Sequence, residues 1–76
     1  MKDFVEYIIK NLVDHPEDIY VREIESEKTS ILEIHCVKSD IGKIIGKNGA
    51  TINALRILVQ NLAYKNETRV FLEICE

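Results

Sequence analysis

The stretch from Ile41 to Ile52 holds all three glycines of this 76-residue chain, at positions 42, 46 and 49. It also holds four isoleucines, more than a flexible linker would carry, so buried helical segments are expected on both sides of the glycines. Glycine tolerates positive φ and lets another backbone approach closely. The sequence Gly46-Lys47-Asn48-Gly49 therefore predicts a tight turn between two buried helices, with its backbone amides open to a ligand.

The ligand of this turn is expected to be an anion. Lys47 stands at its tip, and Gly49 opens a helix whose free N–H groups favour negative charge. The formal net charge of the chain is -3, which argues against the broad positive footprint of a duplex-DNA binder. Residues 38–56, however, carry four basic side chains and one acidic side chain, a charge of +3. The other residues carry six basic and twelve acidic side chains, a charge of -6. A local positive site on an acidic body favours a short contact with a phosphate backbone.

Hydrophobic periodicity divides the chain into helices and strands. Apolar residues at helical spacing predict a first helix, which Pro16 ends. Three short segments rich in β-branched residues predict strands, and a polar turn joins the first two as an antiparallel hairpin. The predicted elements are a helix over Met1–Val13, strands over Ile19–Glu25 and Ser30–Val37, a short helix over Ile41–Ile45 capped by Ser39 or Asp40, a helix over Ala50–Lys65 and a strand over Thr68–Cys75.

The order of these elements predicts an α+β fold. A strand-helix-helix-strand crossover with both helices on one face places the last strand parallel to the second. We expect one domain over residues 1–76, a three-stranded mixed sheet with three helices packed on one face, since a single core still suffices at this length. The long helix is expected to face the core with Ile52, Leu55, Leu58, Val59 and Leu62. The sheet is expected to turn Tyr20, Ile31, Val37 and Phe71 away from the helices.

Four local features carry specific expectations. The alternation of apolar residues slips between Val21 and Ile24, which predicts a β-bulge or an early end of the strand. Asn66 is expected to cap the long helix. Gly42 is expected to permit close packing of its helix. His15 directly precedes Pro16, at which the first helix is expected to end, and is expected to be solvated.

No pattern typical of catalysis is present in the sequence. The carboxylates are scattered, and none combines with a histidine or a nucleophile in a catalytic arrangement, so no enzyme, no catalytic residue and no cofactor are expected. The phosphate-binding loop of nucleotide hydrolases needs one more residue between Gly42 and Gly46, and Asn48 stands in place of its magnesium-binding hydroxyl.

The chain also lacks the residue spacing of a zinc site, so no metal is expected. Cys36 and Cys75 form no Cys-x-x-Cys or Cys/His pattern, and we interpret them as reduced structural residues rather than a disulfide. His35 points away from the core side of its strand and is interpreted as a surface histidine rather than a base or a ligand.

A membrane location is not indicated. No apolar run reaches the roughly 18 residues needed to span a bilayer, and the amino terminus Met-Lys-Asp-Phe-Val-Glu lacks a signal-peptide pattern. A cytosolic location is expected.

The order of the elements, with Ile45-Gly46-Lys47-Asn48-Gly49-Ala50-Thr51-Ile52 between the two central helices, resembles the KH domain. The hallmark of that domain is an isoleucine-glycine-x-x-glycine-x-x-isoleucine turn. The extra helix and strand before the core motif are typical of the prokaryotic type II arrangement, and the resemblance covers the whole chain. The segments Leu-Val-Asp-His-Pro-Glu-Asp, Gly-Lys-Ile-Ile-Gly-Lys-Asn-Gly and Leu-Arg-Ile-Leu-Val are similar to those of the small stand-alone bacterial RNA-binding proteins of the KhpA family.

The resemblance implies binding of single-stranded RNA, with about four nucleotides clamped along their backbone by the Gly-x-x-Gly turn. It implies a non-catalytic bacterial protein of the cytoplasm that acts as a post-transcriptional regulator or RNA chaperone. It also implies self-association or pairing with a larger KH-containing protein. Carried onto this chain, the clamp is formed by Gly46, Lys47, Asn48 and Gly49, and the groove between it and the sheet is lined by Ile44, Ile45, Ile52 and the exposed edge of the hairpin.

Other polar side chains are candidates for RNA contact. Asn53 and Arg56 lie four and seven residues after Gly49, hence on roughly one face of the helix, where they can reach base or phosphate. Lys43 is interpreted either as a contact or as an ordinary solvated residue. No aromatic residue is expected near the turn to stack on a base, so the predicted affinity for unstructured RNA is modest.

Two alternatives remain open at this stage. In one, the chain is a protein-interaction module in which RNA is secondary and the open sheet face or an edge strand pairs with another protein. In the other, the bound strand is single-stranded DNA, because discrimination between the two depends on contacts to the 2'-hydroxyl group.

Overall fold

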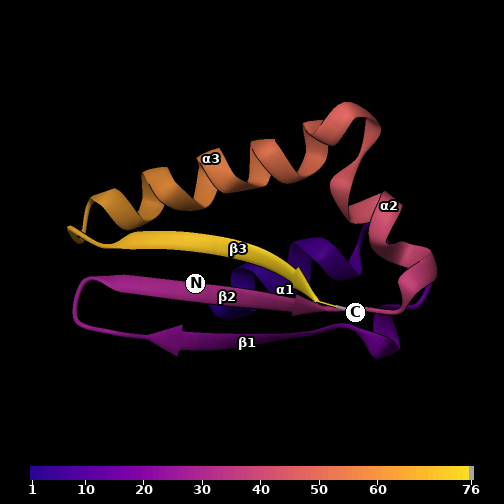
Figure 1. Cartoon of the computed structure of the whole chain (residues 1–76), viewed down its shortest axis with the longest axis horizontal. Helices are drawn as coiled ribbons and strands as arrows, with labels where there is room; N and C mark the ends of the chain where they lie inside the picture. Colours follow the sequence, from indigo (N-terminus) through magenta and orange to yellow (C-terminus); the bar gives the residue numbers. More distant parts are fainter. Residues whose placement is uncertain (76) are drawn as a thin grey trace.

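The computed structural model describes residues 1–75, and the order of its elements confirms the predicted α+β fold (Figure 1). Its helices and strands are α1 (Lys2–Lys10), β1 (Tyr20–Glu25), β2 (Thr29–His35), α2 (Ile41–Ile45), α3 (Ala50–Tyr64) and β3 (Arg69–Cys75). Short 3-10 turns over Pro16–Asp18, Lys38–Asp40 and Lys47–Gly49 connect them. The predicted boundaries differ from these mainly at helix ends, where the first helix stops three residues earlier than expected.

The sheet is mixed and its pairing is continuous. The strand order is β1-β2-β3, with β1 antiparallel to β2 and β2 parallel to β3. The expected bulge near Ile24 is absent, because Val21 pairs with Ile34 and Ile24 pairs with Ile31 in one unbroken register. Ile24 breaks the apolar alternation for a different reason: its side chain joins Ile31 on the face of the sheet that turns away from the helices.

The core lies between the other face of the sheet and the helices. In Figure 1, α1 lies behind the strands and α3 runs along β3. The apolar residues of the core that are fully or almost fully buried are Val5, Ile9, Ile19, Val21, Leu32, Ile34, Cys36, Ile44, Ile52, Leu55, Val59, Ala63, Val70 and Leu72. No helix within residues 1–75 is long and apolar enough to cross a membrane.

The buried face of α3 differs from the predicted one at two positions. Leu58 and Leu62, expected to point inward, are 43% and 40% exposed. The buried stripe passes instead through Leu55, Val59 and Ala63, because a helix that crosses the sheet contacts it at intervals of three and four residues. Ala63 was not recognisable as a core residue because its side chain is small.

The end of α3 is closed by a left-handed residue, but this residue is Glu67 and not Asn66. Glu67 has φ 55°, and the N–H groups of Glu67 and Thr68 donate to the carbonyls of Tyr64 and Ala63 at 3.0 and 3.2 Å. These paired bonds satisfy carbonyls that the helix end would otherwise leave open. The reversal then leads directly into β3.

Helix side chains cover backbone groups on both outer edges of the sheet. At the β3 edge, Gln60 Nε2 donates to the Thr68 carbonyl at 3.3 Å and Gln60 Oε1 accepts from the Val70 N–H at 3.1 Å. At the β1 edge, a carboxylate oxygen of Glu6 accepts from the Val21 N–H at 3.3 Å. The Gln60 amide thus makes the two backbone hydrogen bonds that a neighbouring strand would make with Thr68 and Val70.

Candidate nucleic-acid interface

The turn between α2 and α3 is built from three residues with positive φ. Gly46 has φ 78° and ψ 173°, Asn48 has φ 55° and ψ 26°, and Gly49 has φ 77° and ψ 10°. The Gly46 N–H closes α2 by donating to the Gly42 carbonyl at 2.9 Å, and the Gly49 N–H donates to the Gly46 carbonyl at 3.1 Å. Gly46 therefore occupies a region of backbone space that is essentially restricted to glycine, whereas Asn48 and Gly49 are left-handed.

The three glycines differ in the space around them. A Cβ added at Gly46 would overlap Thr51 Oγ1 and would lie 2.6 Å from Thr51 Cβ and 2.9 Å from its backbone nitrogen. At Gly49 a Cβ would only touch Asn53 Nδ2 at 3.4 Å. At Gly42 nothing lies within 4 Å, so the expectation that Gly42 permits close packing of its helix is wrong. Gly46 alone is required by the packing of the turn.

Two backbone donors at the tip of the turn have no acceptor. Within residues 1–75, no hydrogen bond engages the N–H groups of Lys47 and Asn48, while the neighbouring N–H groups of Gly46, Gly49 and Ala50 are all bonded. Both residues are exposed and lie directly before the amino end of α3, which has 15 residues. Adjacent free N–H groups next to a helix amino terminus form a setting that favours an anion.

A buried carboxylate holds α2 against the segment after α1. Asp40, fully buried at the start of α2, accepts from the N–H groups of Asp14 and His15 at 3.2 and 3.0 Å. Its Oδ2 also lies 3.2 Å from Nδ1 of the His15 ring. Asp40 makes no capping bond to its own helix, and the His15 ring, although about half exposed, is partnered rather than only solvated.

The same bonds determine the acidity of Asp40. Burial on its own raises the pKa of this carboxyl group, but the hydrogen bonds from the Asp14 and His15 backbone and from the His15 ring outweigh it. The net result is a pKa below the ordinary value of an aspartic acid, so the group is charged at neutral pH. The charged, fully bonded carboxylate fixes the direction in which α2 approaches the turn.

A chain of polar contacts leads from the turn along α3 to β3. Asn53, whose amide faces Gly49, accepts from the Arg56 guanidinium at 3.4 Å, and the same guanidinium donates to the Leu72 carbonyl at 3.4 Å. Lys43, on α2, lies 3.5 Å from the Asp14 carboxylate and remains about half exposed. Asn53, Arg56 and the turn thus lie on one continuous surface.

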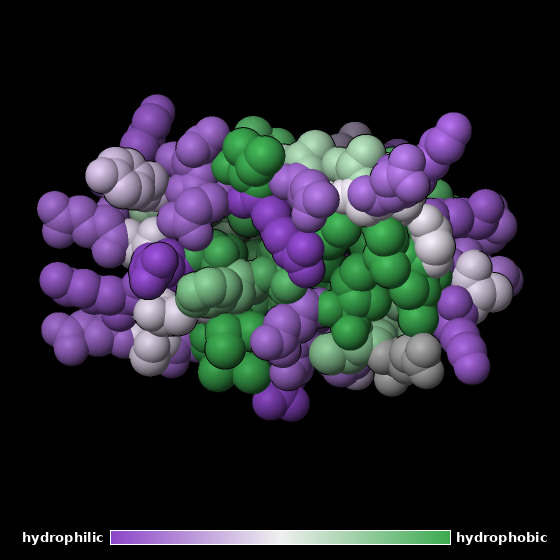
Figure 2. All heavy atoms as spheres, turned by 45° about the horizontal axis from the view of Figure 1, so that its top comes forward, coloured by the Kyte–Doolittle hydropathy of each residue, from purple (hydrophilic) through white to green (hydrophobic). Residues whose placement is uncertain are grey.

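This surface continues into a groove of about 600 Å³ between α3 and the β3 edge. Arg56, Ile57 and Gln60 line it from the helix, and Phe71 and Leu72 line it from the strand. Apolar side chains gather in the middle of this side of the molecule, where a band of hydrophilic ones crosses them, and hydrophilic side chains cover both ends (Figure 2). The sequence did not predict that Ile57, Gln60 and Phe71 line a groove. The apolar alternation of the strand did predict that Phe71 points away from the helices, and Phe71 is 47% exposed.

A family model described as KhpA/KhpB, KH domain, matches residues 2–74 of the chain. The chain belongs to the KhpA/KhpB KH-domain family. This confirms the resemblance drawn from the Gly-x-x-Gly turn and the type II order of elements, and it places the chain in a non-catalytic family. No solved structure gives a significant match to the chain.

Relatives over the full length support the same assignment. A protein of Chlamydia caviae named RNA-binding protein KhpA is 53% identical over 76 residues, covering 100% of this chain and 97% of the relative. A protein of the same name in Clostridium perfringens is 45% identical and covers 97% of this chain and 99% of its own length. Another in Aquifex aeolicus is 42% identical and covers 100% of this chain and 96% of its own length.

In this KH domain, the expected site residues do not all lie on the surface of the turn. Gly46, Lys47, Asn48 and Gly49 form the turn itself, and Asn53 and Arg56 present polar atoms beside it. The amine of Lys43, on α2, lies instead 3.5 Å from the Asp14 carboxylate. Of the three isoleucines expected to line the groove, only Ile45 is exposed, at 36%, whereas Ile44 and Ile52 are 0% and 4% exposed. Ile44 and Ile52 therefore support the KH turn from the core, and the β3 edge, not the edge of the β1-β2 hairpin, borders the groove.

Proposed function

We propose that this protein binds single-stranded RNA by clamping the backbone of about four nucleotides at the Gly46–Gly49 turn. The observation that carries the proposal is the pair of unbonded N–H groups of Lys47 and Asn48 between two glycines with positive φ. A phosphate can approach these donors because no side chain projects from Gly46 or Gly49, and Lys47 adds a positive charge beside it. The names of the relatives as RNA-binding proteins support the same ligand.

The bases of the bound strand are proposed to lie along α3. Asn53 and Arg56 offer an amide and a guanidinium beside the turn, and Phe71 offers an exposed ring in the groove that follows. An aromatic ring and a guanidinium plane are typical platforms for unstacked bases, and they compensate for the absence of an aromatic residue at the turn. Ile45 contributes an exposed apolar side chain from α2.

Since the family is non-catalytic, the proposed role is regulatory. A protein that holds a few nucleotides in single-stranded form competes with base pairing and with other ligands of the same segment. This is the activity of a post-transcriptional regulator or an RNA chaperone in the bacterial cytoplasm, and no cofactor enters it.

The proposal is tested by giving acidic side chains to the two residues whose backbone N–H groups are the proposed donors. In Lys47→Asp/Asn48→Asp, two carboxylates face the phosphate, so binding to short single-stranded RNA in a fluorescence anisotropy titration is expected to fall at least about 100-fold. The chain provides a matched control, because the same dipeptide occurs at Lys65-Asn66, which is exposed and lies beyond the carboxyl end of α3. Lys65→Asp/Asn66→Asp changes the net charge equally and should retain most of the affinity.

Equal losses in the two double variants would show that binding depends on overall charge and not on the turn. Unchanged affinity in the turn variant would refute the site. Titration with DNA of the same base sequence separates RNA binding from general single-strand binding.

A second candidate function is protein pairing through the open face of the sheet. Tyr20 and Phe71 are exposed there, as the apolar alternation predicted, and Ile24, which it did not predict, is exposed beside them. Ile31 lies between Ile24 and Phe71 in the register. The proposed occupant is a second copy of the chain or a larger KH-containing protein. Analytical ultracentrifugation over a range of concentrations tests self-pairing, and a strictly monomeric protein at high concentration would contradict it.

A further inference from the structure

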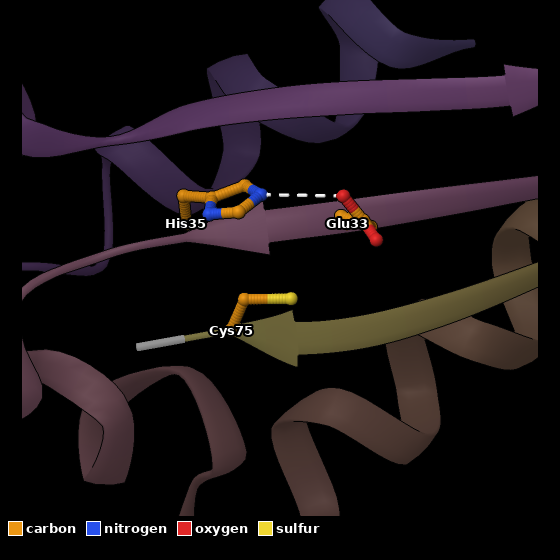
Figure 3. Close-up of side chains that lie close together, drawn as sticks. All are labelled: Glu33, His35 and Cys75. Atoms are coloured by element: carbon orange, nitrogen blue, oxygen red, sulfur yellow. Dashed lines mark hydrogen bonds and ion pairs between the residues drawn. The ribbon is translucent and has the colours of Figure 1, made fainter.

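Three side chains with metal-binding atoms meet on the open face of the sheet, away from the turn. Glu33 and His35 are two residues apart on β2 and so point to the same side, and Cys75 on β3 is the register partner of His35 (Figure 3). One oxygen of Glu33, one ring nitrogen of His35 and the sulfur of Cys75 all lie within 4.8 Å of one another. The three donors therefore come from two hydrogen-bonded strands whose spacing the ladder fixes.

The surroundings restrict the motion of these donors. The ring of Tyr20 stacks on the His35 ring with a centroid distance of 4.3 Å and an angle of 2° between the planes. His35 Nε2 lies 3.4 Å from Glu33 Oε1, and the two side chains are only 23% and 20% exposed. The histidine is thus held with its Nε2 directed toward the carboxylate, which is a prepared position for a shared ligand.

The local charge also favours a cation. Glu73 is the register partner of Glu33 and lies on the same open face, so a second carboxylate adjoins the one that belongs to the cluster. Arg22 opposes them, with its Nε 3.4 Å from Glu33 Oε1, but its side chain is 65% exposed and can rotate into solvent. Cys75 forms no disulfide.

We propose that Glu33, His35 and Cys75 bind one zinc-type divalent cation, with the fourth position open to solvent. Sulfur, imidazole nitrogen and carboxylate oxygen are the three donor types of zinc sites, whereas magnesium and calcium prefer oxygen alone. No zinc spacing is visible in the sequence, because His35 and Cys75 are 40 residues apart and are neighbours only through the parallel pairing of β2 and β3.

Binding requires small movements and the release of one proton. In a tetrahedral site the donors are about 3.5 Å apart, so the cluster has to contract, and rotation about the χ1 bond of Cys75 can supply this. The Cys75 thiol transfers its proton to the buffer as the metal–sulfur bond forms, and His35 binds through its neutral Nε2. The thiolate and the Glu33 carboxylate then balance the two charges of the cation.

Titration of the intact protein with cobalt(II), a spectroscopic substitute for zinc, tests the site. We expect a thiolate-to-cobalt charge-transfer band and the intense visible bands of tetrahedral cobalt, saturating at one equivalent per chain and lost on addition of zinc. Cys75→Ser should abolish the charge-transfer band, and His35→Gln should weaken binding about 100-fold or more, because losing a direct ligand costs at least as much as losing an outer partner. His15→Gln removes the other histidine of the chain and should leave the titration unchanged.

Several results would overturn the proposal. One is the absence of a charge-transfer band in the unsubstituted protein, and another is a cobalt titration of Cys75→Ser that equals that of the unsubstituted protein. A third is saturation at half an equivalent of cobalt per chain with dimer formation, which would place the metal between two chains. A measurement without variants adds a further test: zinc should slow alkylation of Cys75 at least about tenfold, located by mass spectrometry, and an unchanged rate would contradict the site.

Discussion

The structure predicts that replacing Gly46 and Gly49 with alanine has very different effects on folding, although both glycines belong to the same motif. At Gly46, φ 78° and ψ 173° lie in a region that costs other residues about 1–3 kcal/mol. The added Cβ would also collide with Thr51, including its backbone nitrogen at 2.9 Å, and such overlap in a packed region costs about 1–3 kcal/mol more. The sum is about 4 kcal/mol, or about 3 kcal/mol after the roughly 0.4–1 kcal/mol that alanine recovers by restricting the unfolded chain.

At Gly49 the expected cost is far smaller. Its backbone is left-handed, which costs alanine about 1–2 kcal/mol, and the nearest atom to the added Cβ is the flexible Asn53 amide at 3.4 Å. Alanine recovers about 0.4–1 kcal/mol by restricting the unfolded chain. The net cost is therefore about 1 kcal/mol.

Urea unfolding followed by circular dichroism measures both effects. A domain of this size has a stability of about 4–11 kcal/mol, so Gly46→Ala should be largely unfolded or have its midpoint lowered by several molar, and Gly49→Ala should lose about 1 M. Gly42→Ala is the control, because open space surrounds that position and alanine favours a helix, so its stability should be unchanged or higher by up to about 1 kcal/mol. Equal midpoints for Gly46→Ala and Gly49→Ala would refute the steric reasoning.

Two further predictions concern the ends of α2 and α3. The pKa of Asp40 is lower in the folded state than in the unfolded state, so its stabilising contribution is complete above the unfolded pKa of about 3.9 and is lost as the pH falls through the folded pKa. Asp40→Asn should therefore be less stable than the unsubstituted protein at neutral pH, with a difference that shrinks below about pH 4 in urea titrations; a difference independent of pH would contradict this. Glu67→Gly should raise the free energy of unfolding by about 0.5–1 kcal/mol, because glycine adopts φ 55° without strain, and Glu67→Ala, the control, should show no such gain.

The elements and their order were predictable because they depend on local patterns. Three segments rich in β-branched residues and a helical repeat before Pro16 are visible within short windows, and the right-handed crossover then fixes the parallel pairing of β2 and β3. The turn was also predictable from a local pattern, because its two glycines and its lysine lie within four consecutive residues.

The errors fall where distant segments decide the outcome. Leu58 and Leu62 satisfy a helical repeat as well as Leu55 and Val59 do, and only the crossing of α3 over the sheet decides which pair is buried. Asp40 looked like a helix cap, but its partners Asp14 and His15 are about 25 residues away, and no local rule points to them. The groove at Phe71 and the Glu33, His35 and Cys75 cluster likewise depend on which strand lies next to β2 and α3.

The covered edges of the sheet have a consequence for the behaviour of the protein at high concentration. Ladder-like growth, in which one chain extends the sheet of the next, requires free donors and acceptors along an outer strand. Here the side chain of Gln60 engages the Thr68 carbonyl and the Val70 N–H on one side, and Glu6 engages the Val21 N–H on the other. An incoming strand would have to displace these groups before it could pair at these positions, which disfavours edge-to-edge growth there.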